Sequence, residues 1–338
     1  MDTVKPLPWI MKQAPMRRML LALSPLVLAA IWLYGWKSLA MVCIAATVGW
    51  IVERLMLRPY HEPVSQAVFV TTTIFALSLP PTIPLWMVAL GSIVAVLFGK
   101  MVFGGFGRDV FNPAMVGRAF LYVSFGQAMT GVWALPLTGF LGNFPQAASA
   151  AAGTHGLFPA GFGAWSPGVD AITSATPLAS AAPSRIDLLV GTVPGSLGES
   201  SAILIGLAAI YLIWTKTANW RIIVPCLVGF MATWIPLWAA EVTTRSGILL
   251  PDPLVGLTAG GVLFGIVFIA TDPVSAAVTN GGRWIYGVII GASTVLIRVF
   301  SVWPEGMMFA ILLGNMFAPI IDWVIKNRKA RPAPGATP

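Results

Sequence analysis

Long apolar runs dominate the chain, and polar residues gather in short stretches between them. Several runs approach the roughly 20 residues that a helix needs to cross the hydrocarbon core of a bilayer. The runs lack the apolar/polar alternation of a membrane β-barrel, so their backbone groups must be satisfied within helices. The pattern predicts ten helical spans, at about residues 19–36, 38–57, 64–80, 85–103, 113–129, 200–215, 221–240, 254–270, 284–302 and 305–324.

Two of these spans are interrupted by proline and polar residues. The third ends in Ser-Leu-Pro-Pro at 78–81, and the eighth ends in Ala-Thr-Asp-Pro at 270–273. Proline removes a backbone donor and stops a helix. Broken helices are tolerated at membrane depth only where they are buried in protein or line a cavity. Both breaks are therefore expected to lie inside the protein.

The two halves of the chain resemble each other. In residues 68–105 and 263–304, a helix leads to a proline break and then to a full helix with a late Lys or Arg. Five spans per half is an odd number, so the second half would be inverted in the membrane, with binding sites near the midplane between the halves. We therefore expect an all-α polytopic membrane protein with a five-helix repeat (1–129), a loop segment (130–199), an inverted five-helix repeat (200–325) and a tail (326–338).

Composition supports the membrane assignment. Hydrophobic residues make up 57% of the 338-residue chain and charged residues only 9%, against about 25% charged in soluble domains. The net charge of +8 is spread over short clusters beside helix ends, without a basic stripe interleaved with aromatics, so no nucleic-acid partner is expected. The N-terminus superficially resembles a signal peptide. Its apolar run continues to Trp36 and another follows at once, so we expect a retained first helix.

The distribution of basic residues predicts the orientation. If the N-terminus is cytoplasmic, fifteen Lys and Arg residues lie on the cytoplasmic side, three lie opposite and two lie within spans. This bias places both termini in the cytoplasm and segment 130–199 in the periplasm of a bacterial inner-membrane protein. The three opposite residues are Lys37, Arg185 and Arg245, and the two within spans are Arg118 and Arg298.

Polar residues within membrane spans are energetically costly, so those in the predicted spans are candidates for a functional role. Asn112 precedes Pro113 and Asp272 precedes Pro273, so both are expected where a helix starts or breaks. Backbone donors and acceptors are free there, and a planar heterocycle could use them. The structural alternative is that Asp272 caps a half-helix and pairs with an arginine.

Two acids lie near the cytoplasmic ends of spans. Glu53 and Asp322 could be steps on a cation path, but acids at helix ends are also commonly just solvated. No metal site is predicted, because the Cys and His residues lack metal-ligand spacing. They are interpreted as packed thiols and unpaired imidazoles: Cys43, Cys226, His61 and His155.

One polar motif lies in the Gly- and Pro-rich segment between the two halves. The sequence DAITSATPLAS, residues 170–180, resembles the flavinylation signal D-x-x-[S/T]-x-A-T, with Asp170, Thr173, Ala175 and Thr176 in place. An ordinary Ser/Thr-rich loop is the alternative. Longer blocks resemble the same family, among them HEPVSQAVFVTTTIFALSLPPTIPLW, VFGGFGRDVFNPAMVGRAFLY and ATDPVSAAVTNGGRWIYGVIIG. This is the NqrB/RnfD family, which comprises one membrane component of the Na+-translocating NADH:quinone oxidoreductase and its counterpart in the related Rnf complex.

This resemblance implies two flavins. Thr176 would carry FMN through a phosphodiester bond, installed by a flavin transferase outside the membrane. A noncovalent riboflavin would lie within the membrane domain, at the positions of Asn112 and Asp272. Asp109 stands where some relatives have Asn, which puts that contact in doubt. Glu53 and Asp322 match acids that the family associates with cation passage.

The resemblance also implies a function. The chain would be one subunit of a redox-driven Na+ or H+ translocase, not catalytic alone, that relays electrons between the covalent FMN and the buried flavin. Its partners would be other membrane and flavinylated subunits, with quinone as a candidate ligand, and the choice between the two complexes stays open. A secondary transporter or solute channel with inverted repeats is the alternative, since fold alone does not establish function. A purely structural scaffold within a redox complex is a third.

Overall fold

The computed structural model describes residues 9–130, 136, 165, 185–191, 193–199, 201–245, 247–301 and 306–330. Helices make up most of this part of the chain. Two strands of two residues each, β1 (Ile10–Met11) and β2 (Val64–Ser65), pair in parallel beside the helices. The all-α prediction therefore holds apart from this minimal sheet.

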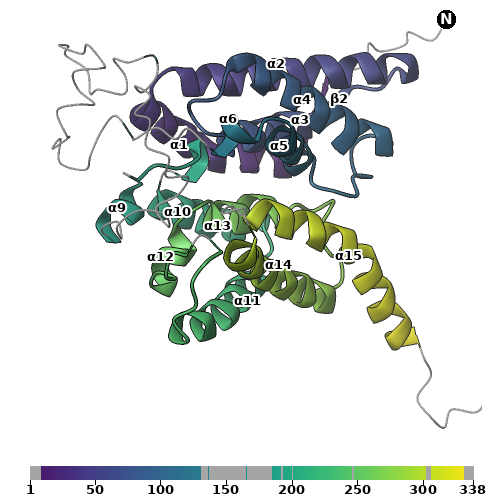
Figure 1. Cartoon of the computed structure of the whole chain (residues 1–338). Coiled ribbons are helices and arrows are strands. Elements are labelled where there is room, and N and C mark those ends of the chain that lie inside the picture. The colour runs from purple at the N-terminus through teal and green to yellow at the C-terminus, as the bar shows by residue number, and fades with distance from the viewer. Residues whose placement is uncertain are drawn as a thin grey trace, which may run out of the picture.

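The first half of the chain forms one layer, drawn in purple to blue in Figure 1. Within it, α2 packs against α1, α3 and α4, and α4 packs against α5. Its helices are α1 (Ala14–Tyr34), α2 (Lys37–Leu57), α3 (Ala67–Leu77), α4 (Leu85–Gly99), α5 (Pro113–Ser124) and α6 (Gly126–Thr130), with short turns η1 (Arg58–Tyr60) and η2 (Met101–Phe103).

The second half forms the other layer, from teal to yellow in Figure 1. Here α14 packs between α11 and α15, while the pairs α1–α10 and α5–α15 join the two layers. Its elements are α9 (Arg185–Val190), η3 (Leu197–Glu199), α10 (Ala202–Trp214), α11 (Trp220–Ala239), α12 (Pro253–Thr258), α13 (Val262–Phe264), the π-helical turn η4 (Gly265–Ile269), α14 (Asn280–Phe300) and α15 (Gly306–Ala330).

Each predicted interval contains helix, but the helices differ in length. Six are long and apolar enough to cross a membrane, and the other intervals hold shorter or interrupted helices such as α3 and α10. The six candidate spans of the described chain are Ala14–Tyr34, Lys37–Tyr60, Leu85–Phe103, Trp220–Ala239, Asn280–Phe300 and Gly306–Arg328.

The break after α3 lies inside the protein, as predicted. The helix ends at Leu77, and the hydroxyl of Ser78 donates to the carbonyl of Phe75 at 2.7 Å. The carbonyl of Leu79 accepts a hydrogen bond from the backbone N–H of Leu197 at 3.1 Å. Since Leu197 belongs to η3, the end of the segment between the two halves packs onto the break and satisfies its backbone.

Arg298 stabilises an interruption at residues 259–261, which lies inside the eighth predicted span and before its proline break at 270–273. Its guanidinium donates to the carbonyls of Gly256 at 2.9 Å, Ala259 at 3.1 Å and Gly260. Gly256 lies in the last turn of α12, and Ala259 and Gly260 follow its end, where carbonyl groups need partners from outside the helix. The chain then turns through Gly260 and Gly261, whose φ angles of 67° and 70° favour glycine. Arg298, which the sequence places within a span, thus completes the hydrogen bonding of a broken helix.

Glycines bring α11 and α14 into close contact. A Cβ atom on Gly291 would overlap the carbonyl oxygen of Cys226, and one on Gly229 would meet the backbone of Val288 at 2.5 Å. Small residues allow such close approach where packing replaces the hydrophobic effect between membrane helices. The buried Cys226 confirms one packed thiol, whereas Cys43 is exposed, so the prediction was wrong there because its helix face is open.

We expect Gly291→Ala to destabilise the protein by about 1–3 kcal/mol, because the methyl group would force α11 and α14 apart. Gly206→Ala in α10 is the matched control, since its added Cβ would meet nothing within 4 Å. The midpoint of thermal unfolding in detergent measures both variants. Equal midpoints for the two would contradict the close packing of α11 and α14.

Candidate functional site

Asn112 begins α5 and points one side-chain atom toward the other half. Its Oδ1 accepts hydrogen bonds from the backbone N–H groups of Ala114 at 3.1 Å and Met115 at 3.3 Å. Asn is a favoured N-cap and Pro113 is suited to the first helical position, which explains why α5 starts here. The Nδ2 atom donates to Oδ2 of Asp272 at 3.2 Å. The structure thus brings the two predicted residues into direct contact.

Asp272 lies in the turn after η4. Its Oδ1 accepts from the backbone N–H of Val274 at 3.2 Å, and its Oδ2 also accepts from the hydroxyl of Ser275 at 2.9 Å. The alternative that Asp272 pairs with an arginine is not what the structure shows, because Arg298 bonds to α12 and Arg118 donates to Ser196 at 3.5 Å. Neutral donors, rather than a cationic group, make the hydrogen bonds to this carboxylate.

Asn315 in α15 is a third member of the cluster, and the sequence pattern did not identify it. Its Oδ1 accepts from the backbone N–H of Asn112 at 3.0 Å. Its Nδ2 donates to the carbonyl of Ser275 at 3.1 Å and to the hydroxyl oxygen of Tyr286 at 2.9 Å. The fully buried amide therefore joins α5, α14 and the turn after η4. Its position within an apolar run is the signal that could have identified it.

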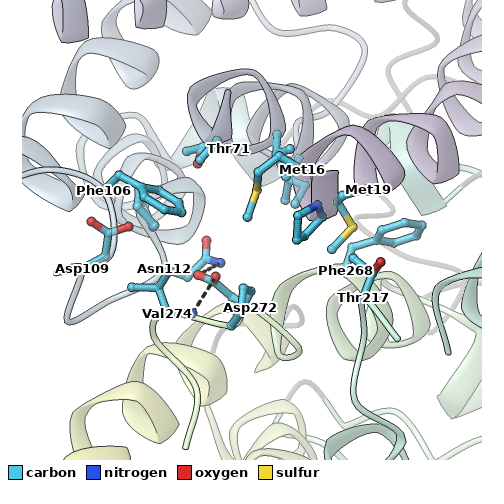
Figure 2. A pocket seen from close by; sticks show the side chains of 16 residues that line it. Met16, Met19, Thr71, Phe106, Asp109, Asn112, Thr217, Phe268, Asp272 and Val274 are labelled. Atoms are coloured by element: carbon cyan, nitrogen blue, oxygen red, sulfur yellow. Dashed lines mark hydrogen bonds between the residues drawn. The ribbon is translucent and has the colours of Figure 1, made fainter. Parts of the chain in front are cut away.

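A cavity opens beside this cluster, between the two halves of the chain. It encloses about 50 Å³, which is room for a few water molecules. Figure 2 shows Asn112 and Asp272 meeting at its edge, among methionine and phenylalanine side chains. Residues that line it include Met16, Met19, Thr71, Phe106, Asp109, Asn112, Thr217, Phe268, Asp272 and Val274.

Asp109 gives this cavity free hydrogen-bonding capacity. Its buried Oδ1 has no hydrogen-bond partner among the residues that the structure describes. Burial raises the pKa of Asp109 to about 7, an effect that the charge of Lys100 opposes. A carboxyl group that can be protonated or ionised near neutral pH could either donate to a ligand or accept from one.

Glu53 is buried and paired rather than solvated, so the solvated interpretation was wrong. Its Oε2 lies 2.6 Å from the ammonium group of Lys100, and both side chains are 1% exposed. Its Oε1 accepts from the N–H of Ser65 at 2.9 Å and from the hydroxyl of Ser65 at 2.7 Å. Lys100 also donates to that hydroxyl oxygen at 2.6 Å. The sequence pattern did not identify Lys100 and Ser65 because only the fold brings α2, β2 and the end of α4 together.

A second cavity, of about 590 Å³, lies beside this ion pair. Glu53, Tyr60, Phe106 and Arg108 are among its lining residues. Phe106 also lines the cavity at Asp272, and its ring centre lies 5.9 Å from the Lys100 ammonium. The loop that contains Phe106 therefore separates the buried ion pair from the cavity between the halves.

Asp322 is also buried, which overturns the solvated interpretation for this acid as well. Its carboxylate accepts from the N–H groups of Val278 at 2.6 Å and Thr279 at 2.9 Å, and from the hydroxyl of Thr279. Thr279 is the N-cap of α14. Asp322 therefore fixes the start of α14.

The four residues of the flavinylation motif lie outside the described part of the chain. The same is true of His155. The motif Asp170, Thr173, Ala175 and Thr176 thus remains a prediction from the sequence.

The chain is similar to known membrane proteins along most of its length. The NQR2, RnfD, RnfE family matches residues 10–331. The NqrB component of the Na(+)-translocating NADH-quinone reductase of Ectopseudomonas mendocina is 39% identical over 292 residues, which cover 84% of this chain and 67% of the relative. The same component in Yersinia pestis is 40% identical over 280 residues, covering 80% and 63%. The chain thus spans about two thirds of the length of these relatives.

We expect Lys100→Met to destabilise the protein by about 3–5 kcal/mol, because it leaves the carboxylate of Glu53 buried without a counter-charge. The double variant Glu53→Gln/Lys100→Met is the matched control and should recover much of the loss, since it removes both charges. Thermal unfolding of the purified variants gives the interaction energy. If the double variant is less stable than Lys100→Met, the pair is not what stabilises this site.

Proposed function

This chain belongs to the NQR2, RnfD, RnfE family, and on that premise we propose that it is the flavin-carrying membrane subunit of a redox-driven ion translocase. Its role would be to relay electrons between a covalent FMN on Thr176 and a noncovalent flavin at the Asn112–Asp272 cavity. The hydrogen-bonded contact between Asn112 and Asp272, which joins the two halves beside a cavity, is the observation that carries this proposal.

The lining of this cavity fits a planar heterocycle such as the riboflavin ring. Phe106, Phe268 and the methionines offer apolar faces, and Asp109, Asn112 and Asp272 offer polar groups to a ring edge. Its volume requires side chains to move before a tricyclic ring can enter. Met16 and Met19 suit that movement, because methionine is unbranched and adaptable. When bound, a flavin would supply single-electron chemistry, and the protein would supply position and electrostatics.

The covalent site rests on the motif and on the predicted topology. A threonine hydroxyl among small residues needs access to a transferase more than it needs activation, since the enzyme supplies the base. Most basic residues lie on the same side of the membrane as the two termini. This excess supports a cytoplasmic placement of both termini and a periplasmic placement of segment 130–199 in a bacterial inner-membrane protein. A flavin transferase and further membrane or flavinylated subunits would be the partners.

The helix neighbours support the proposed inverted repeat. In the first half α4 packs between α2 and α5, and in the second half α14 packs between α11 and α15. We assign residues 1–129 and 200–325 to the two repeats on this ground, with segment 130–199 between them and the tail 326–338 after them. The Asp272 cavity would then lie between the two repeats, where such folds bind their ligands.

Of the two acids proposed for cation passage, Glu53 is the stronger candidate. Asp322 is committed to three hydrogen bonds at the start of α14. Glu53 shares its carboxylate with Lys100, beside a large cavity. A Na+ or H+ that passes Glu53 would have to displace the Lys100 ammonium, because one carboxylate cannot compensate two cations in a buried site.

We expect Thr176→Val to abolish covalent flavin in chain that is co-expressed with a flavin transferase, because the substitution removes the hydroxyl. In-gel flavin fluorescence of the denatured protein measures the adduct. Thr154→Val, in the same segment, is the control and should keep the signal. A wild-type band without fluorescence would contradict the covalent site and favour the secondary transporter.

We expect Asp272→Ala to reduce the noncovalent flavin content at least tenfold while Thr176 remains modified, because the variant loses the partner of Asn112. Acid-extractable flavin per protein, measured by chromatography, is the readout. Asp252→Ala is the matched control, since Asp252 also precedes a proline and caps a helix but lies outside this cavity. Unchanged flavin content in Asp272→Ala would reject the buried site.

A further inference from the structure

Two arginines at the starts of different helices share one neutral acceptor. Nη1 of Arg221 in α11 donates to Oδ1 of Asn280 at 2.9 Å, and Nη1 of Arg283 in α14 donates to the same oxygen at 3.2 Å. Among the described residues the ion pair found is that of Lys100 with Glu53, so no carboxylate there neutralises either guanidinium. The two cations repel each other, and an anion that bridges them would relieve that repulsion.

A cavity of about 520 Å³ lies beside these two guanidinium groups. A third cation, Lys216, lines it in the turn between α10 and α11. Asp272 is the acid of this lining, and its carboxylate is already engaged by Asn112, Ser275 and the N–H of Val274. The cavity therefore has three cationic side chains against one carboxylate, and room for an anionic group.

Aromatic side chains indicate the depth of this cavity in the membrane. The rings of Trp220 and Trp284 meet edge to face at 6.4 Å, and they are 46% and 42% exposed. The guanidinium carbon of Arg221 lies 5.4 Å from the centre of the Trp220 ring. Exposed tryptophans of membrane proteins concentrate at the level of the lipid headgroups. The basic cavity therefore lies where a headgroup can reach it.

From these observations we propose that the cavity formed by Lys216, Arg221 and Arg283 binds the phosphate of an acidic phospholipid. Guanidinium groups bind phosphate oxygens in a bidentate manner, and Asn280 already holds the two groups together for that contact. A zwitterionic headgroup brings its own ammonium group, which three protein cations would repel. Acidic lipids are therefore preferred over zwitterionic ones. This site does not depend on the flavin-carrying role.

Native mass spectrometry of the delipidated full chain tests this assignment. Titration with phosphatidylglycerol should show tighter binding than titration with phosphatidylethanolamine. The double variant Arg221→Gln/Arg283→Gln should weaken phosphatidylglycerol binding about thirtyfold, from roughly fivefold for each basic residue lost at a membrane surface. Lys326→Gln/Arg328→Gln in α15 is the matched control, with the same loss of charge outside the cavity, and should change binding less than threefold.

Three outcomes would overturn the proposal. Equal binding of the two lipids would remove the headgroup preference, and equal weakening in the control variant would reduce the effect to general surface charge. Displacement of the lipid by inorganic phosphate at a similar concentration would assign the cavity to a soluble anion. If the double variant fails to fold, the variant Lys216→Gln/Arg221→Gln is used in its place, because it also removes two charges from this cavity. The flavin content of the same samples is measured in parallel. A loss of flavin would count against the proposed flavin site and would not bear on the lipid result.

Discussion

Backbone groups at interrupted helices must be satisfied from within the protein, and this constraint organises the structure. In the hydrocarbon region no water replaces a missing partner, so every free carbonyl or N–H needs a protein group. Arg298 serves the carbonyls that end α12, Asn112 serves the start of α5 and Asp322 serves the start of α14. The polar residues that are costly in a membrane are therefore placed where interrupted helices or helix starts leave backbone groups in need of partners.

The same constraint brings candidate ligand groups together. Asn112 uses its carbonyl oxygen on α5, which leaves its amide nitrogen to face Asp272 in the other half. Asn315 in α15 then ties Asn112 and the turn that contains Asp272 to α14, through hydrogen bonds to Ser275 and Tyr286. A ligand at this cavity would contact both halves at once. Its binding would therefore depend on how the two halves pack.

The buried Lys100–Glu53 pair adds an electrostatic element close to that cavity. A desolvated pair is retained at a cost, because well-packed apolar residues would commonly be at least as stable. Phe106 lines the cavities on both sides of the intervening loop. Phe106 thus borders the cavity at Asp272 as well as the cavity at the ion pair, and its ring centre lies 5.9 Å from the Lys100 ammonium. The buried charge pair and the cavity between the halves therefore share one bordering side chain in a chain of the NQR2, RnfD, RnfE family.

The sequence by itself determined the membrane class, the approximate helices, both proline breaks and the family. It did so because hydrophobicity, proline and helix caps act locally, within a few residues. It also identified Asn112 and Asp272 as residues at helix starts or breaks. Their contact joins positions 160 residues apart, which local patterns do not encode.

Only the tertiary structure decided which polar groups meet. Each partner lies far away along the chain. Glu53 pairs with Lys100, 47 residues away, and Asp322 pairs with Thr279, 43 residues away. Asn112 pairs with Asn315, 203 residues away. The sequence therefore favoured solvated acids and left an arginine beside Asp272 as an alternative, whereas packing buried both acids and gave Asp272 neutral donors. The physical reason is that burial and pairing are properties of the helix assembly, while the sequence pattern reports the preference of each segment alone.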